Sequence, residues 1–381
     1  MPMNKVLSGL VLLLAYFVFL SFKSIGLSTG DDLTVDSLRK VYSKPKKEWP
    51  KANVDNGVTF EELGELLPSP LNLKSDSVKK LIELGKILFF DPRLSGSNQI
   101  SCSSCHVPDL NWQDGRRVSV GHDHLENIRN APSLENIWQA KKLFWDGRAN
   151  SLEDQAAMPV TAHNEMHQDM KLLSKKLGKI KGYQPYFLAA FGSKQITNDR
   201  IFASLATFQR SIVSRRTDFD RFLAKDKNAL TDQQLVGLHL FRTKARCMNC
   251  HNGPFFTDNQ FHNDGLTYYG RKYEDLGLYN VTKNPEDVGK FKTPGLRNVM
   301  RTAPWFHNGL FGDMDGVMNM YNMGMPVQRV KPEQEKDPLL PKNDKLLRGI
   351  RLSNSEKEAV IAFLGSLSSS PFLLRVEELP K

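Results

Sequence analysis

The chain has 381 residues, a length that suits two or three domains of ordinary size. Hydrophobic residues make up 40% of it and charged residues 25%, which supports a packed core and argues against a disordered, a collagen-like or a polytopic membrane protein. The net charge is +10, but the basic residues are scattered and form no stripe with interleaved aromatic residues, so nucleic acid is not expected as a partner.

The N-terminus has the pattern of an export segment. Lys5 precedes an uncharged apolar run at residues 6–22, and Lys23 follows it. The run is about 17 residues long, at the short end of what spans a bilayer. Residues 1–27 are therefore expected to be either a cleaved signal peptide or a membrane anchor, and the protein is expected in the periplasm. Residues 28–72 are expected to form a tether.

All four cysteines fall in two copies of one pattern, CSSCH at 102–106 and CMNCH at 247–251. C-x-x-C-H is the attachment motif of c-type haem, in which two thiols about one helical turn apart reach two vinyl groups and the histidine ligates the iron. A zinc ribbon is disfavoured because the two cysteine pairs lie much farther apart in the chain than the pairs of such a ribbon. The motifs predict two covalently bound haems c, held by Cys102, Cys105, Cys247 and Cys250, with His106 and His251 as iron ligands.

An internal repeat divides the rest of the chain into two related halves. The block APSLEN…FWDG at 131–147 returns as TPGLRN…FHNG at 293–309, with the same offset at every matched position. Apolar residues at helical spacing predict helices, whereas alternation typical of strands is rare; the helices are expected at 78–90, 201–212, 232–243 and 355–367. We expect a mainly α fold of two tandem cytochrome c-like haem domains with long loops, at 73–222 and 223–381.

From about Leu84 onward, the sequence resembles the bacterial di-haem cytochrome c peroxidases and the related MauG enzymes. The motifs that carry the resemblance are LGKILFFDPRLS, SCSSCH, RNAPSL, FWDGRANSLEDQA, NEM, CMNCH and FKTPGLRNVMRTAPWFHNG. The resemblance implies reduction of hydrogen peroxide to water, with single electrons from a small donor protein, either a c-type cytochrome or a cupredoxin. It also implies that the first haem meets peroxide and that the second passes electrons on.

The resemblance assigns roles to single residues. Glu165 and Gln155 match the pair that lies over the peroxide-binding haem, with Glu165 as the acid/base that moves a proton between the two peroxide oxygens. Trp145 matches a tryptophan that relays charge between the haems. His122 matches the residue that fills the sixth position of the first iron in the resting enzyme, with His124 as the alternative.

Two further features follow from the resemblance. Asn130, Thr302 and Pro304 match positions that supply oxygen ligands to an interdomain calcium ion. The oligomeric state is left open, with a homodimer as one alternative, and an uncleaved N-terminus would tether the protein to the membrane.

The sixth ligand of the second haem departs from the peroxidase pattern. Peroxidases have Met at a fixed distance after the histidine of FHNG, whereas this chain has Tyr321 at that distance from His307, as MauG-type enzymes do. Met320 and Met323 are the alternatives, and a thioether raises the haem potential that a phenolate lowers. Two other functions therefore stay open: a MauG-type oxidase that modifies a partner protein, and a non-catalytic electron-transfer cytochrome. Glu165 and Gln155 argue against the latter, because a carrier needs no proton shuttle.

Overall fold

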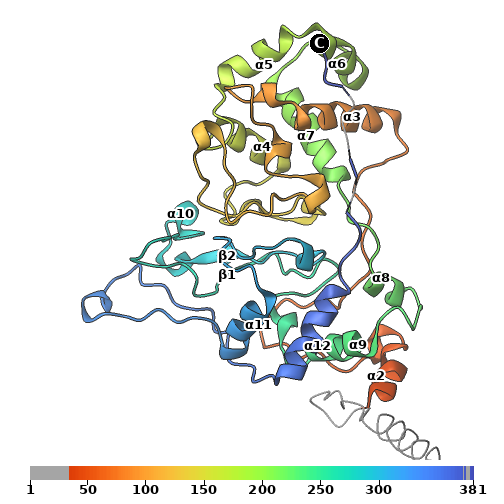
Figure 1. The fold of residues 1–381 in the computed structure, drawn as a ribbon, viewed down its shortest axis with the longest axis vertical. Coiled ribbons are helices and arrows are strands. Elements are labelled where there is room, and N and C mark those ends of the chain that lie inside the picture. The colour runs from red at the N-terminus through yellow and green to blue at the C-terminus, as the bar shows by residue number, and fades with distance from the viewer. Residues whose placement is uncertain (1–33, 372, 375–377) are drawn as a thin grey trace, which may run out of the picture.

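The computed structural model describes residues 34–371, 373–374 and 378–381. The expected signal or anchor segment at 1–27 lies outside the described residues. Among the residues that are described, no helix is both long and apolar enough to cross a bilayer. Figure 1 shows two lobes, with α3 to α7 in one and α2, α8 to α12 and the two strands in the other.

The fold is mainly helical, as expected from the sequence. The first lobe contains α3 (Asp76–Phe90), α4 (Leu152–Thr161), α5 (Met170–Gly178), α6 (Gln184–Phe191) and α7 (Asn198–Ser211). The second contains α2 (Val35–Tyr42), α8 (Asp218–Leu223), α9 (Asp232–Arg242), α10 (Tyr279–Thr282), α11 (Met314–Met323), α12 (Asn354–Gly365) and an antiparallel pair of strands, β1 (Phe261–Asn263) and β2 (Lys290–Lys292). Short 3-10 turns connect them at Lys46–Glu48, Pro92–Leu94, Cys102–Ser104, Pro108–Leu110, His122–His124, Ile137–Gln139, Lys181–Tyr183, Cys247–Asn249, Pro285–Asp287, Val299–Arg301 and Pro332–Gln334.

Each domain is built on a pair of helices that cross at a glycine. In the first domain, α3 packs against α7, and a Cβ at Gly85 would lie 2.0 Å from the carbonyl oxygen of Ser204. In the second domain, α9 packs against α12, and a Cβ at Gly237 would lie 1.9 Å from the carbonyl oxygen of Ala359. Any larger residue at either glycine would force the two backbones apart.

The repeat predicted from the sequence is confirmed in the backbone. Phe144 and Phe306 are equivalent in the repeat, and both have φ of 64°, in the left-handed region that side chains rarely adopt. The 3-10 turns Ile137–Gln139 and Val299–Arg301 also fall at equivalent positions. The two haem motifs each begin with a 3-10 turn, at Cys102 and Cys247. The two halves are therefore copies of one local fold.

The terminal segments are exchanged between the two domains. Residues 34–66 do not form a free tether, because Leu38, Tyr42 and Leu63 are buried in the core of the second domain. At the other end, the chain returns to the first domain (Figure 1), where the Gly182 N–H donates to the carbonyl oxygen of Lys381 over 2.7 Å. We call residues 34–66 the N-terminal arm. Burial of its apolar side chains is favourable, which explains why the arm packs on the second domain.

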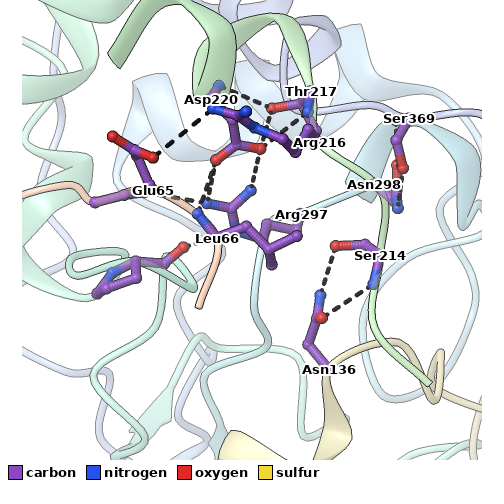
Figure 2. Close-up of polar contacts among 12 residues, drawn as sticks. Glu65, Leu66, Asn136, Ser214, Arg216, Thr217, Asp220, Arg297, Asn298 and Ser369 are labelled. Carbon is purple, nitrogen blue, oxygen red and sulfur yellow. Dashed lines mark hydrogen bonds and ion pairs between the residues drawn. The ribbon is translucent and has the colours of Figure 1, made fainter. Parts of the chain in front are cut away.

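The change of domain falls in the segment before α8. Phe219 and Phe222 of α8 are buried in the core of the second domain. The whole of α8 therefore packs with the second domain, whereas the boundary expected between residues 222 and 223 would assign most of this helix to the first domain. A side-chain amide holds the chain leaving the last helix in each domain (Figure 2). Asn136 donates to the Ser214 hydroxyl over 2.9 Å, and its repeat partner Asn298 accepts from the Ser369 N–H over 2.6 Å.

A buried ion pair joins three segments of the second domain (Figure 2). Arg297 donates to both carboxylate oxygens of Asp220, over 2.9 and 3.0 Å, and the two side chains are 3% and 1% exposed. Asp220 also accepts from the Leu66 N–H over 2.8 Å, and Arg297 donates to the Gly64 carbonyl over 3.1 Å. The N-terminal arm is therefore tied to α8 and to the TPGLRN block through one pair of charges.

We expect Asp220→Asn to destabilise the protein by about 3 kcal/mol or more, because it leaves the guanidinium of Arg297 buried without its counter-charge. Burial alone raises the pKa of Asp220, but Arg297 outweighs it and holds that pKa below its ordinary value. The stabilisation is therefore present at neutral pH and is lost as the pH falls through the lowered pKa. The thermal unfolding midpoints of wild type and variant should differ at pH 7 and converge in acid.

Arg221→Gln is the matched control, because Arg221 pairs with Asp218 and Asp226 on the surface, where its side chain is 55% exposed. Exposed pairs contribute little. Equal unfolding midpoints for wild type and Asp220→Asn at pH 7 would show that the buried pair does not hold the arm.

Candidate functional site

The two C-x-x-C-H histidines are oriented in the same way. The His106 Nδ1 lies 3.0 Å from the carbonyl oxygen of Trp112, and the His251 Nδ1 lies 2.9 Å from that of Phe256. Because a carbonyl only accepts, Nδ1 carries the proton and Nε2 keeps its lone pair. Burial lowers the pKa of both histidines, so both imidazoles are neutral, as an iron ligand must be.

The four cysteines are free thiols. Burial raises the pKa of Cys102 and of Cys247 to about 12, and that of Cys105 to about 11. Each motif thus presents two free thiols and one neutral imidazole. This donor set fits a c-type haem, in which each thiol becomes a thioether and the imidazole binds iron.

A cavity of about 310 Å³ adjoins the second motif and reaches the face between the domains. The second domain contributes Cys247, Cys250 and His251 to its wall, and the first domain contributes Asn130 and Trp145. A cavity that begins at the attachment motif and is mostly lined by apolar side chains suits a porphyrin.

One face of α11 forms part of this wall. Met314, Val317, Met318 and Tyr321, which are spaced for one helix face, line the cavity. Met323 lies on another face and is 85% exposed, whereas Met320 packs against the core of the second domain. Of the three residues considered as sixth ligand, only Tyr321 therefore lies on the cavity wall. Burial raises the pKa of its phenol.

His262 is a second polar group on the same wall, and the sequence assigned it no role. It lies between two carboxylates, with Nε2 2.9 Å from Asp258 and Nδ1 2.6 Å from Asp344. Burial alone lowers its pKa, but the two carboxylates raise it to about 12. Cys250, Asp258 and His262 are close enough together to hold a metal ion, but a protonated imidazole is not a ligand and Cys250 belongs to the haem motif.

Glu165 lies at the first motif. The helix α4 carries half-buried Gln155 and is capped by Ser151, whose hydroxyl accepts from the Asp154 N–H over 3.0 Å. A turn leads from the end of α4 to Glu165. Glu165 accepts a hydrogen bond from the Asn127 amide over 3.0 Å. Burial raises its pKa, although the Asn127 bond and the charge of Arg148 oppose this.

The Glu165 carboxylate is close enough to both thiols of the first motif to raise their pKa by its charge. Asn127 was not singled out in the sequence, since it lies 38 residues from Glu165 and only the fold brings them together. Glu165 therefore combines partial burial, one hydrogen bond and proximity to the attachment cysteines, features that suit a group that takes up and releases a proton.

His122 belongs to a loop that is bonded to the Glu165 segment. Its N–H donates to the carbonyl oxygen of Glu165 over 2.9 Å. The His122 ring lies 4.5 Å from that of His167 and 6.0 Å from that of His163, two exposed residues that flank Glu165 in the sequence. His124 is exposed. The structure thus brings His122 and Glu165 together.

Trp145 and the three expected calcium positions meet at the domain interface. The Trp145 indole N–H donates to the carbonyl oxygen of Asn130 over 2.9 Å, and the carbonyl oxygen of Trp145 accepts from the Lys292 N–H of the second domain over 2.9 Å. Asn130, Thr302 and Pro304 all line the cavity described above. Trp145 is therefore held by hydrogen bonds from both domains.

The chain is similar to known proteins over most of its length. A family model described as di-haem cytochrome c peroxidase matches residues 79–228. The cytochrome-c peroxidase IdrP1 of Pseudomonas sp. (strain SCT) is 35% identical over 352 residues, which cover 85% of this chain and 90% of that protein. The methylamine utilization protein MauG of Methylorubrum extorquens is 37% identical over 302 residues, which cover 78% of this chain and 81% of that protein.

Solved structures share the fold. The crystal structure of a MauG-like protein associated with microbial copper homeostasis has a TM-score of 0.68 at 28% sequence identity. The match covers 85% of this chain and 94% of that one.

The Asn127 contact makes a prediction about the protonation of Glu165. Asn127→Leu removes a hydrogen bond that favours the carboxylate, so it should raise the pKa of Glu165 further above its ordinary value. The infrared C=O band of the protonated carboxyl, assigned by its loss in Glu165→Gln, should then persist to a higher pH than in the wild type. Asn150→Leu, which alters an exposed amide bonded to Lys142, should leave the titration unchanged, and an unchanged titration in Asn127→Leu would refute the contact.

Proposed function

The chain belongs to the di-haem cytochrome c peroxidase and MauG family, and we propose from this membership and from the site at Glu165 that it reduces hydrogen peroxide to water. Each turnover consumes one peroxide, two protons and two electrons and yields two water molecules. The electrons come singly from a small donor protein, a c-type cytochrome or a cupredoxin. The observation that carries the proposal is the half-buried, hydrogen-bonded Glu165 beside the first haem motif.

Two haems are the cofactors of this family, and we propose that both are bound covalently. Each thiol S–H adds across one vinyl C=C of the porphyrin, so no atom is lost. Cys102, Cys105 and His106 would hold the first, and Cys247, Cys250 and His251 the second. Bound haem supplies an iron centre that accepts single electrons and offers a position where peroxide is reduced.

Glu165 moves the proton. Asn127 holds its Oε1, which leaves Oε2 to take a proton from the inner peroxide oxygen and to return it to the outer one, so that the outer oxygen leaves as water. The raised pKa of Glu165 suits both proton transfers, because a carboxyl group of intermediate acidity can take up a proton and then release it. Gln155 would hold the departing water by its amide.

We propose that His122 would be a ligand to the iron of the first haem when that haem is bound. Its backbone bond to Glu165 joins the two loops. Movement of His122 would therefore shift the Glu165 segment with it, so that access to the site and proton transfer by Glu165 would change together. Trp145, bonded to both domains, would relay the electron between the haems.

A calcium ion would bridge the two domains through Asn130, Thr302 and Pro304, which come from both domains to one cavity wall. Oxygen atoms with retained waters are the ligands that calcium prefers. The export pattern at residues 1–27 supports a periplasmic location, the compartment in which c-type haem is attached.

A specific observation favours a second candidate, a MauG-type oxidase that modifies a partner protein. Tyr321 lies on the cavity wall while Met323 is exposed, which supports a tyrosine oxygen as the sixth ligand in place of the usual thioether. The two functions separate in one assay with a reduced small cytochrome. Turnover only after half-reduction selects the peroxidase, and high-valent iron formed directly from the oxidised protein selects the oxidase.

We expect Glu165→Gln to lower the rate of peroxide reduction by about 10²- to 10⁴-fold, because the glutamine amide does not take up and release a proton as a carboxyl group does. Both haems should stay attached, as measured by the pyridine haemochrome. Glu126→Gln changes an exposed residue paired with Arg117 and should keep wild-type turnover. Full activity in Glu165→Gln would contradict the assignment of the acid/base.

The identity of the sixth ligand is tested by Tyr321→Phe and Met323→Leu. Because Tyr321 lies on the cavity wall and Met323 does not, Tyr321→Phe should change the absorption and EPR spectra of the second haem, whereas Met323→Leu should leave them as in the wild type. The opposite result would assign the ligand to the methionine.

A further inference from the structure

The repeat places Trp145 and His307 at equivalent positions, and both line the cavity between the domains. Their backbones meet the other domain in the same way. The Lys292 N–H donates to the carbonyl oxygen of Trp145 over 2.9 Å, and the Asn130 N–H donates to that of His307 over 2.8 Å. Asn130 and Lys292 are themselves equivalent in the repeat, so the two bonds are copies of each other.

The side chains break this equivalence. The Trp145 indole N–H is satisfied by the Asn130 carbonyl. His307 is 1% exposed, and neither of its ring nitrogens has a hydrogen-bond partner among the residues that the structure describes. Its ring is stacked on Phe291, with centroids 3.5 Å apart and planes within 9°. Stacking fixes the ring but satisfies neither nitrogen, and a buried polar atom without a partner needs an explanation.

The nearby carboxylates of the protein make no hydrogen bond to His307 and bind arginines instead. Both oxygens of Asp275 accept from Arg129, over 2.7 and 2.9 Å. Asp146 pairs with Arg129 and with Arg148. The missing group must therefore belong to what fills the cavity, whose wall also contains Cys247 and Cys250.

A haem attached at Cys247 and Cys250 has two carboxylates, which are the strongest hydrogen-bond acceptors that it offers. In either protonation state of the His307 ring, at least one nitrogen carries a proton to donate. An ionised carboxylate is the acceptor that a buried neutral N–H binds most strongly.

We propose that His307 donates a hydrogen bond to a propionate of the second haem and thereby anchors that haem at the domain interface. The contact completes a path of hydrogen bonds from the haem edge through the His307 carbonyl and Asn130 to the Trp145 indole. The inference rests on the two-haem part of the proposed function, and it does not depend on the reaction with peroxide.

Resonance Raman spectroscopy of the oxidised holoprotein tests the contact, because the propionate bending band moves to lower frequency when its hydrogen bond weakens. His307→Phe keeps an aromatic ring on Phe291 but removes the donor, so the difference spectrum should show the band of one haem shifted down. The other haem cancels in the difference and serves as the internal control. His307→Gln retains an amide N–H and should restore the band at least in part.

Trp145→Phe is the matched variant at the equivalent repeat position, and it should leave the propionate bands unshifted, because the Trp145 indole bonds to Asn130 instead. If His307→Phe loses haem, His307→Asn can replace it in the comparison. The shorter amide moves the N–H donor away from the propionate, so the propionate band should again shift to lower frequency.

Unshifted propionate bands in a His307 variant that retains two haems would overturn the inference and leave water as the partner. The pyridine haemochrome separates this result from failure of the proposed function, since a wild-type protein with fewer than two haems would refute the cofactor assignment itself.

Discussion

Arg129 ties the two domains together beside the residue that is proposed to carry charge between them. Its guanidinium binds both oxygens of Asp275 in the second domain and one oxygen of Asp146, which follows Trp145 in the chain. It also lies 5.8 Å over the ring of Phe291, its own counterpart in the repeat. A buried guanidinium must keep its partners, because an uncompensated charge at this depth is costly. The position of Trp145 against the second domain depends on this cluster.

Equivalent residues of the repeat face each other across the domain interface, so the interface is approximately two-fold symmetric. The hydrogen bonds of Asn130 to His307 and of Lys292 to Trp145 are copies of each other, so the two domains meet through the same stretch of their repeat. Duplication of one ancestral haem domain explains why both domains use the same stretch of the repeat at their interface. The unequal roles that we propose for the two haems would follow from side chains that differ at equivalent positions of the repeat, where Trp145 corresponds to His307 and Glu135 to Arg297.

The exchanged termini limit how the two domains move relative to each other. The N-terminal arm is buried on the second domain and tied by Arg297 and Asp220, and the last residues pack on the first domain. The chain therefore passes between the two domains near both of its ends as well as before α8, and these crossings restrain relative motion of the domains. Smaller changes of conformation are therefore expected in loops, such as those of His122 and Glu165, whose side chains are partly exposed.

The sequence alone determined the features that are local in the chain. It shows two haem motifs, because haem attachment needs five consecutive residues. It also predicts a helical fold of two domains, because the internal repeat and the helical spacing of apolar residues are visible in the order of the residues. Tertiary structure alone decided what depends on burial and on distant partners. It brought Asn127 to Glu165, buried an N-terminal arm that reads as a charged tether, and separated Tyr321 from Met323 by the helix face each occupies. It also left both nitrogens of His307 unpaired. Burial and pKa depend on what packs around a group, and residues far apart in the sequence supply that packing.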